Sequence, residues 1–417
     1  MKRRVLGSVL FVACGSALAQ TSDLDALKLA DTAVANVEPP LDWQWFVEAA
    51  VGQILADDGL GSMANNRWST NFQLNTALTD RFRFVMGDRL DVTSKNNVTG
   101  QSAVNTLKEA YVSWQIDKHR FIDVGRIKQL YGAAIGYNPT DYFRTGAVRS
   151  IVSIDPNSLK ENRLGSVMVR GQTLWDTGSL TAIYSPRIEA HPSSAALDPD
   201  FGATNNRNRW LLALTQKVYR NLSPQVLLYG EEGGSVQAGL NLNAAPTDAL
   251  VTFFEWSGGR GKSQLAQAFD QPAPLAFHQR FATGLTYTTA SKVSMTLEYE
   301  FDSAAPSAAE WRALRQAPPM VYGQYRVTTQ ALQDLATKQS VFGYVSWQDA
   351  IVKHLDLNAM LRFSVTDNSC LSWVEARYHL NRVDLALQLQ AAGGSRASEY
   401  APSAYHYAWQ ALARYYF

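Results

Sequence analysis

The sequence predicts an all-β protein, a transmembrane barrel of roughly 16–18 antiparallel up-and-down strands, with 18 as the best count. Apolar and polar residues alternate over long stretches, and the connections between these stretches alternate between short and long. No run approaches the roughly 18 apolar residues of a membrane-spanning helix. Charged residues make up only 18% of the 417 residues, whereas hydrophobic residues make up 46%. This composition suits strands that turn one face to lipid.

The first segment of the chain has the composition of a secretory signal peptide. Lys2–Arg4 precede the apolar run Val5–Val12, and the small residues Ala17–Ala19 follow. A basic head, a short apolar segment and a small-residue site predict cleavage after residue 19. A lipoprotein signal with Cys14 as the lipidated residue is a less favoured alternative, because Phe11 stands where such sites usually have leucine. A buried N-terminal strand or helix is less favoured still.

The mature chain is expected to be weakly acidic and free of intrachain disulfides. Cleavage removes three basic residues and no acidic one, so the formal net charge changes from +1 to −2. This charge gives no indication of a nucleic-acid partner. Cys370 is the one cysteine beyond the signal peptide. Residues 20–42 read as a periplasmic N-terminal segment. Within it, Thr21–Pro40 suits a short helix or a loose lead-in that ends at Pro39-Pro40, and a disordered leader is favoured over a partner-binding segment.

The alternating stretches define the barrel, residues 43–417, from a first strand at Trp43–Ile54 to a last strand at Tyr405–Phe417. Successive side chains of a strand point to opposite faces. In the last strand one face carries Tyr407, Trp409, Tyr415 and Phe417. We expect this face to contact lipid, with Phe417 closing the barrel beside the first strand.

The predicted strands and connections favour a membrane barrel over a soluble sandwich. The strands run to about 9–13 residues, longer than the usual 5–6. Links such as Thr79–Arg81 and Asp117–Arg120 are short, whereas most of those between them are long, which indicates short periplasmic turns and long extracellular loops. Of the eleven tryptophans, all but Trp311 lie in or at the ends of predicted strands, as expected for interfacial aromatic girdles.

Inward positions of such a barrel form its functional surface, because about 18 strands leave room for a water-filled lumen. The alternation predicts a basic side, an acidic side and a further inward arginine, Arg280. The basic side comprises Arg126, Lys128 and Arg170, and the acidic side comprises Glu298, Glu300 and Asp302. Two such walls would set a transverse field that selects ions. Alternatively, these charges pair with neighbours and only solvate the lumen.

The long loop at residues 133–163 is the predicted constriction. It adds Arg144 and Arg149 to the basic side, and its many apolar residues argue against disorder. Folding inward would bury these residues and narrow the pore. An outward cap packed on neighbouring loops is the alternative.

Three consecutive motifs resemble a known family. "LKEAYVSW" (Leu107–Trp114), "GRIKQLYG" (Gly125–Gly132) and "GYNPTDYF" (Gly136–Phe143) are similar to a pattern in porin-like outer-membrane barrels of the alginate-export type and related channels. The resemblance implies passage of small solutes or export of an anionic polymer. Phe417 resembles the terminal signature that the barrel-assembly machinery reads, so Tyr415 and Phe417 are the expected assembly signal.

Signals for catalysis are weak. The six histidines show no metal-ligand spacing, and "GGRGKS" (Gly258–Ser263) lacks the first glycine of a phosphate loop. We expect no enzyme, cofactor or metal, and predict a channel of the Gram-negative outer membrane for passive diffusion of small hydrophilic or charged solutes. Expected partners are membrane lipids, the assembly machinery and the solute. The alternatives are an export or accessory barrel for a secreted polymer or peptide, and a sealed surface-binding barrel. The sequence leaves monomer and trimer equally open.

Overall fold

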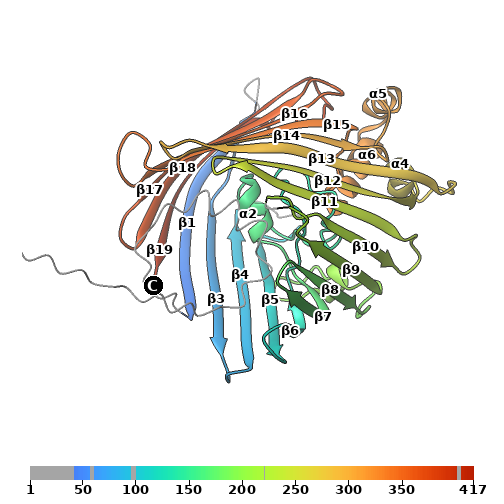
Figure 1. Ribbon diagram of the computed structural model, residues 1–417. Helices are drawn as coiled ribbons and strands as arrows, with labels where there is room; N and C mark the ends of the chain where they lie inside the picture. The colour runs from blue at the N-terminus through green and yellow to red at the C-terminus, as the bar shows by residue number, and fades with distance from the viewer. Residues whose placement is uncertain (1–41, 57–60, 95–99, 220, 402–404) are drawn as a thin grey trace, which may run out of the picture.

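The computed structural model describes residues 42–56, 61–94, 100–219, 221–401 and 405–417. The expected signal peptide and nearly all of the expected N-terminal segment lie outside these residues. The described chain forms one antiparallel sheet that curves around a lumen (Figure 1). Its strands are β1 (Trp43–Ala56), β2 (Ser62–Ala64), β3 (Arg67–Ala77), β4 (Phe82–Thr93), β5 (Ala103–Gln115), β6 (Arg120–Ile127), β7 (Ser166–Trp175), β8 (Gly178–Ser185), β9 (Arg209–Gln216), β10 (Gln225–Glu231), β11 (Gln237–Thr247), β12 (Leu250–Gly261), β13 (Ala276–Thr288), β14 (Val293–Asp302), β15 (Gln339–Trp347), β16 (Leu355–Ser364), β17 (Cys370–His379), β18 (Val383–Gly393) and β19 (Tyr405–Tyr416).

The barrel closes between its first and last strands. β1 pairs with β3 on one side and with β19 on the other, so the sheet has no free edge. β2 continues β3 in the same register against β1, since Ala64 pairs with Gln53 and Arg67 pairs with Ala50. These two segments are therefore one strand, and the barrel has the predicted 18 strands.

Alternation of side chains decides the two faces of each strand. In β18, Leu385, Leu387 and Leu389 are 46%, 47% and 48% exposed, whereas Ala386 and Gln388 between them are buried. The exposed leucines lie on the outer surface, and the residues between them point into the lumen. The outer surface is thus a belt of apolar side chains of the kind that contacts lipid.

The end of the chain forms the closure seam. Phe417 stacks on Trp45 with ring centroids 4.0 Å apart, and its backbone N–H donates to the Trp45 carbonyl at 3.1 Å. Tyr415 and Phe417 are 40% and 45% exposed on the outer face. The predicted outward orientation and the predicted pairing with the first strand are both confirmed.

The two rims differ as expected from the connections. Short turns join β3 to β4, β5 to β6, β7 to β8 and β17 to β18, and both chain ends of the barrel lie on this rim. The opposite rim carries the long connections. Their helices are α2 (Pro156–Glu161), α3 (Phe201–Thr204), α4 (Gln264–Ala268), α5 (Ala308–Gln316) and α6 (Pro319–Leu332). Within the described residues, no helix has the length and apolar character needed to span a membrane.

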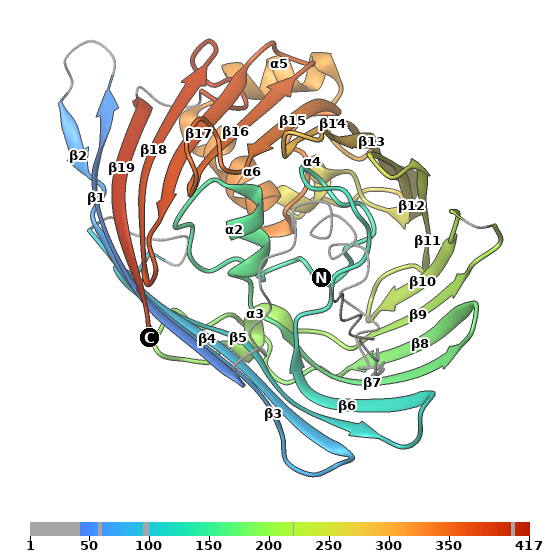
Figure 2. The same cartoon turned by 60° about the vertical axis from the view of Figure 1, so that its left-hand side comes forward.

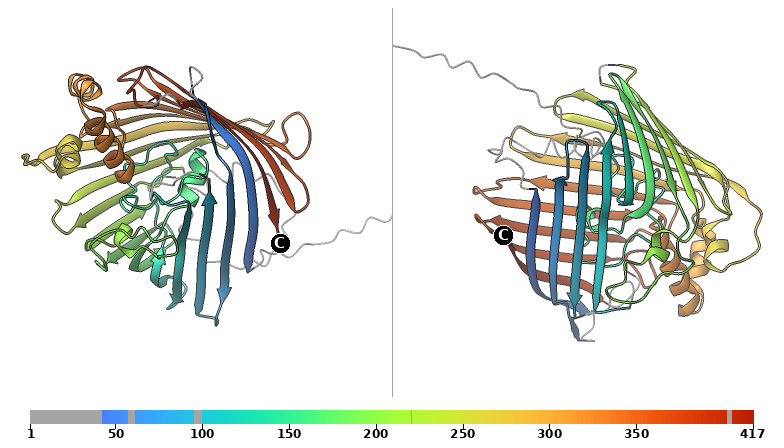
Figure 3. Two further views of the ribbon diagram at one scale, coloured as in Figure 1. Left: turned by 180° about the vertical axis from the view of Figure 1, so that it is seen from behind. Right: turned by 90° about the horizontal axis from the view of Figure 1, so that it is seen from below.

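Three of these helices gather at one part of the long-loop rim (Figure 3). Ser307 caps α5 and forms a reciprocal capping box with Glu310. Trp311 of α5 packs with Tyr322 and Tyr325 of α6 in a buried cluster that also includes Ala268 of α4. The helices therefore form a compact cap over this rim.

Candidate functional site

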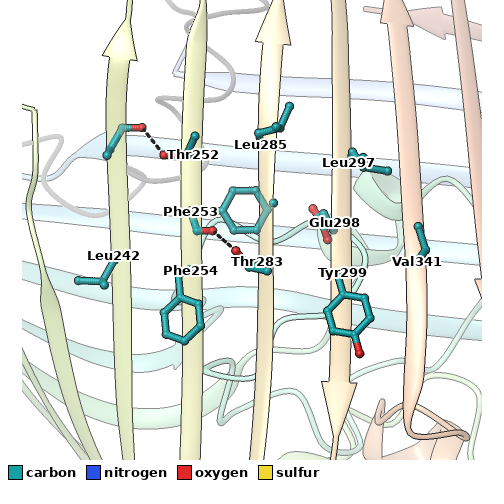
Figure 4. A pocket seen from close by; sticks show the side chains of 12 residues that line it. Leu242, Thr252, Phe253, Phe254, Thr283, Leu285, Leu297, Glu298, Tyr299 and Val341 are labelled. Carbon is teal, nitrogen blue, oxygen red and sulfur yellow. Dashed lines mark hydrogen bonds between the residues drawn. The ribbon is translucent and has the colours of Figure 1, made fainter.

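One hollow lies on the outer face of the barrel. Phe254, Leu285 and Tyr299 line a recess of about 600 Å³ over strands β11 to β15 (Figure 4). Leu285 is exposed on the lipid-facing side of β13, whereas Glu298, the neighbour of Tyr299, is buried on the lumen side of β14. The recess is apolar and faces away from the lumen, so the candidate site for polar solutes lies inside.

The chain between β6 and β7 crosses the lumen. Figure 2 shows α2 and the chain around it inside the ring of strands. Asp141, Tyr142 and Arg144 of this chain line a cavity of about 400 Å³ on the long-loop side. Its later residues, Val152–Asn162, contribute to a second cavity of about 330 Å³ on the other side. The loop predicted as the constriction therefore separates two polar cavities.

The long-loop cavity is predominantly basic. Six cationic side chains line it against three carboxylates, which are Asp141, Glu231 and Asp334. All three carboxylates are ion-paired, and Glu231 and its arginine Arg207 are separated by 2.7 Å. Arg209 has no carboxylate within ion-pair distance among the described residues. The cavity therefore presents an excess of positive charge.

The short-turn cavity is balanced in total but divided in space. The side formed by β1, β3, β4, β5 and β19 is mainly basic, whereas the loop and β16–β17 form a mainly acidic side. The basic side comprises Arg67, Arg89, Lys108 and Arg414 with one acid, Glu48. The acidic side comprises Asp155, Glu161, Asp356 and Glu375 with one base, Arg377. The charges of this cavity are thus divided between two groups of elements, and none of these residues belongs to the two predicted walls.

Glu48 organises the basic side. Its carboxylate lies 2.7 Å from an Arg67 nitrogen and 2.8 Å from an Arg414 nitrogen. Arg89 pairs with Asp91 at 2.9 Å, and Asp91 also accepts from the Ser69 hydroxyl. The Glu48 ion pairs and the bond from Ser69 to Asp91 join adjacent strands, because inward residues of neighbouring strands lie side by side, whereas Arg89 and Asp91 both lie on β4. Glu48 is 2% exposed, so its charge is compensated by arginines rather than by water.

Lys108, Asp155 and Glu161 line this cavity without an ion pair among the described residues. Lys108 donates to the Asn71 side-chain oxygen at 2.6 Å and has no carboxylate within ion-pair distance. Asp155 caps α2 by accepting from the Asn157 N–H at 3.1 Å. Burial raises the pKa of Asp155 to about 7, against the opposing effect of that hydrogen bond. Its charge therefore changes near neutral pH.

The predicted acidic residues lie on β14 beneath the loop. Glu298, Glu300 and Asp302 are 1%, 0% and 0% exposed, so they are covered rather than open to the lumen water. Asp302 accepts from Gln264 at 3.0 Å and pairs with the predicted inward residue Arg280 at 3.3 Å. Their role in ion selectivity stays a prediction.

The predicted basic residues are spread over several places. Arg144 pairs with Asp334 beside the long-loop cavity. Arg170 points inward and pairs with Asp123 at 2.8 Å. Arg149 is buried among loops, where it pairs with Asp200 at 3.2 Å.

Arg126 requires a correction. Arg126 lies opposite Val167 in the register of β6 and β7, two residues along each strand from the pair of Val124 and Val169. Those two valines are 52% and 45% exposed, and residues two apart in a strand share a face. Arg126 therefore shares the outward side, where its guanidinium stacks on Phe201 at 4.8 Å. Lys128 follows the end of β6, and no ion pair to it is found among the described residues.

The residues that sequence reasoning did not select have different explanations. Glu48 and Arg67 lie at inward positions of β1 and β3, so the alternation was a sufficient signal. Lys108 occupies a bulge, because the register shifts between Gly87, which pairs with Glu109, and Asp88, which pairs with Leu107. Both Lys108 and Glu109 then face inward, and a strict period of two misses one of them.

Comparison with known proteins shows similarity at the level of the fold. No protein-family model and no curated protein matches the sequence. OccAB1 of Acinetobacter baumannii is similar, with 10% identity over 90% of this chain and 96% of that one and a TM-score of 0.57. OccK2 (OpdF) of Pseudomonas aeruginosa, solved in complex with glucuronate, has 9% identity over 90% and 98% and a TM-score of 0.55.

A third solved structure has the same architecture. A BenF-like porin from Pseudomonas fluorescens Pf-5 has 9% identity over 90% of this chain and 99% of that one, with a TM-score of 0.55. These alignments span nearly the whole of both barrels. The chain therefore has the closed barrel fold of these porins and porin-like proteins.

Proposed function

We propose that this protein is an outer-membrane channel for passive diffusion of small charged solutes. The observation that carries the proposal is a closed barrel whose inner loop leaves a charged cavity on each side, while its outer face is apolar. A barrel of this size encloses an aqueous lumen unless it is plugged. The short-turn rim would face the periplasm and the long-loop rim the exterior.

The charge of the cavities supports small organic anions as the solute. The exterior cavity has six cationic side chains against three carboxylates, which would raise the local concentration of anions at the entrance. The solved neighbour with bound glucuronate is an example of this fold with a carboxylate ligand. The porin named among the neighbours supports a channel rather than an enzyme.

The loop across the lumen favours small solutes over an extended polymer. It brings Asp141 and Arg144 into one cavity and Asp155 into the other. A polymer would need this loop to withdraw along the length of the lumen. The transverse field predicted from Arg170 and the β14 carboxylates Glu300 and Asp302 belongs to this proposal, and Arg170→Glu should then shift ion selectivity towards cations.

The proposal is tested by reconstitution of the purified protein in planar bilayers. We expect discrete unitary currents with a reversal potential that indicates anion preference in a salt gradient. Liposome swelling should be faster with glucuronate than with a neutral sugar of the same size. Absence of conductance from folded protein, recognised by its heat-modifiable mobility, would contradict the channel.

A single variant tests the anion preference. Lys108→Gln removes a lumen cation without leaving a carboxylate unpaired, because Lys108 donates to Asn71 and forms no ion pair with a carboxylate of the described residues. We expect its reversal potential to move towards cation preference while the unitary current is kept. A wild-type channel that prefers cations would contradict small organic anions as the solute, but it would still agree with the proposed channel function.

A further inference from the structure

The start of the loop, Gly132–Gly136 ("GAAIG"), lies against the inner wall of the barrel. We call these five residues the contact segment. Gly132, Ala133 and Ala134 are buried and Ile135 and Gly136 are partly buried, so the backbone N–H and C=O groups of this segment need hydrogen-bond partners. Outside a strand or helix they find these partners in side chains of the wall and of α2.

Two carboxylates of the wall accept from three successive backbone N–H groups. Glu255 on β12 accepts from Ala134 at 2.6 Å. Glu298 on β14 accepts from Ile135 at 2.7 Å with one oxygen and from Gly136 at 2.8 Å with the other. Both glutamates are at most 1% exposed, so little water competes for these hydrogen bonds.

Two cations bind the carbonyl groups of the same segment. Lys160 of α2 donates to the Ala134 carbonyl at 2.5 Å, and Arg362 on β16 donates to the Gly136 carbonyl at 2.8 Å. The segment is therefore held at both its donors and its acceptors. Lys160 also ties the far part of the loop to its beginning.

The small residues of the segment permit this close approach. A Cβ at Gly132, which has φ +86°, would lie 2.5 Å from a Glu255 carboxylate oxygen. A Cβ at Gly136 would lie 2.2 Å from a Glu300 oxygen and 2.5 Å from the Phe342 ring. Ala133 and Ala134 pack on Phe253 and Ala282. The sequence between the two glycines is thus fitted to the wall.

We propose that Glu298 and Glu255 are positioning residues that hold loop 133–163 across the lumen and so set the size of the aperture. Their oxygens bond to the loop backbone and are covered by it, so they act on solutes through the position of the loop. This inference rests on the proposed channel function. It assigns to the β14 carboxylate Glu298 a mechanical role in place of a direct electrostatic one.

The test is Glu298→Gln in the full-length protein. A glutamine offers one oxygen acceptor, so one of the two N–H bonds is lost and an amide N–H faces a backbone donor. We expect larger unitary conductance, more current noise and an upward shift in the largest polyethylene glycol that enters the pore. Glu298→Gln combined with Glu255→Gln should extend the shift.

Glu231→Gln is the matched control, because Glu231 lines the lumen and pairs with Arg207 away from the contact segment. It should change ion selectivity and leave the exclusion size unchanged. If Glu298→Gln fails to give a heat-modifiable barrel, Lys160→Gln tests the same contact from the loop side. Unchanged exclusion size and noise in whichever variant folds would overturn the inference. Absence of conductance in the wild-type protein would instead contradict the proposed channel function.

Discussion

The two sides of the lumen compensate their buried carboxylates with different partners. On the β12–β14 side, Glu255 and Glu298 accept hydrogen bonds from loop backbone. On the β1–β5 and β19 side, Glu48 is held by arginines of adjacent strands. The bonds of Glu255 and Glu298 fix a loop to the barrel wall, whereas the ion pairs of Glu48 join neighbouring strands to each other. Similar inward glutamates therefore support solute passage on one side and barrel stability on the other.

The largest expected effect concerns the seam of the ion-paired side, where β1 meets β19. Deletion of Phe417 removes the stacking on Trp45 and the hydrogen bond to its carbonyl. We expect a severe loss of folded barrel in the outer membrane, measured by heat-modifiable mobility of membrane fractions. A one-residue deletion within residues 21–40 is the control and should have little effect. Equal losses from both deletions would count against a closure role for Phe417.

The next prediction compares Glu48→Gln with Glu298→Gln, and it distinguishes an effect on barrel stability from an effect on the size of the aperture. Glu48→Gln leaves the buried Arg67 and the partly exposed Arg414 without their carboxylate, and breaking a buried pair such as that of Glu48 and Arg67 costs about 3–5 kcal/mol. We expect that loss in the free energy of unfolding by urea in lipid vesicles, with the exclusion size of surviving channels unchanged. Glu298→Gln disturbs hydrogen bonds to backbone amides and should cost less, about 1–3 kcal/mol. A larger loss from Glu298→Gln would reverse the comparison.

A smaller effect depends on pH and concerns Asp155, at the boundary of the two regions. Burial raises its pKa to about 7, so the carboxyl is neutral below this value and negative above it. The short-turn cavity should therefore become more cation-preferring between about pH 6 and about pH 8, one unit on either side of that pKa. Reversal potentials across this range measure the change. Asp155→Asn should abolish the step, and a step of the same size in the variant would assign it to another group.

The smallest effect is expected outside the lumen. Asp117 and Arg120 form an ion pair in the turn between β5 and β6, where their side chains are 38% and 59% exposed. Exposed pairs contribute little to stability because water screens them. Asp117→Asn should leave urea unfolding and conductance close to those of the wild type. A loss as large as that of Glu48→Gln would show that burial does not decide the difference between these pairs.

The alternation of side chains predicted the barrel well and individual inward residues unevenly. In β18 all the leucines occupy alternate positions and therefore lie on one face, so the lipid-facing side was unambiguous. In β6 each of the two faces carries both polar and apolar residues, because Asp123 lies on one face and Arg126 on the other. Near the long-loop rim, Arg126 is covered by Phe201 rather than by lipid. A polar residue is tolerated there on the outward side, and the alternation no longer identifies the lumen.

By itself, the sequence determined the class of fold, the strand count, the two unlike rims and the position of the last strand, because period-two patterning and turn residues are local properties. Only the tertiary structure decided which charges meet. Glu298 and Gly136 are 162 residues apart in the chain and come together through barrel closure and loop entry. The bulge that turns both Lys108 and Glu109 inward depends on pairing with β4. Contacts of this kind depend on register and on loop path, which no local pattern encodes.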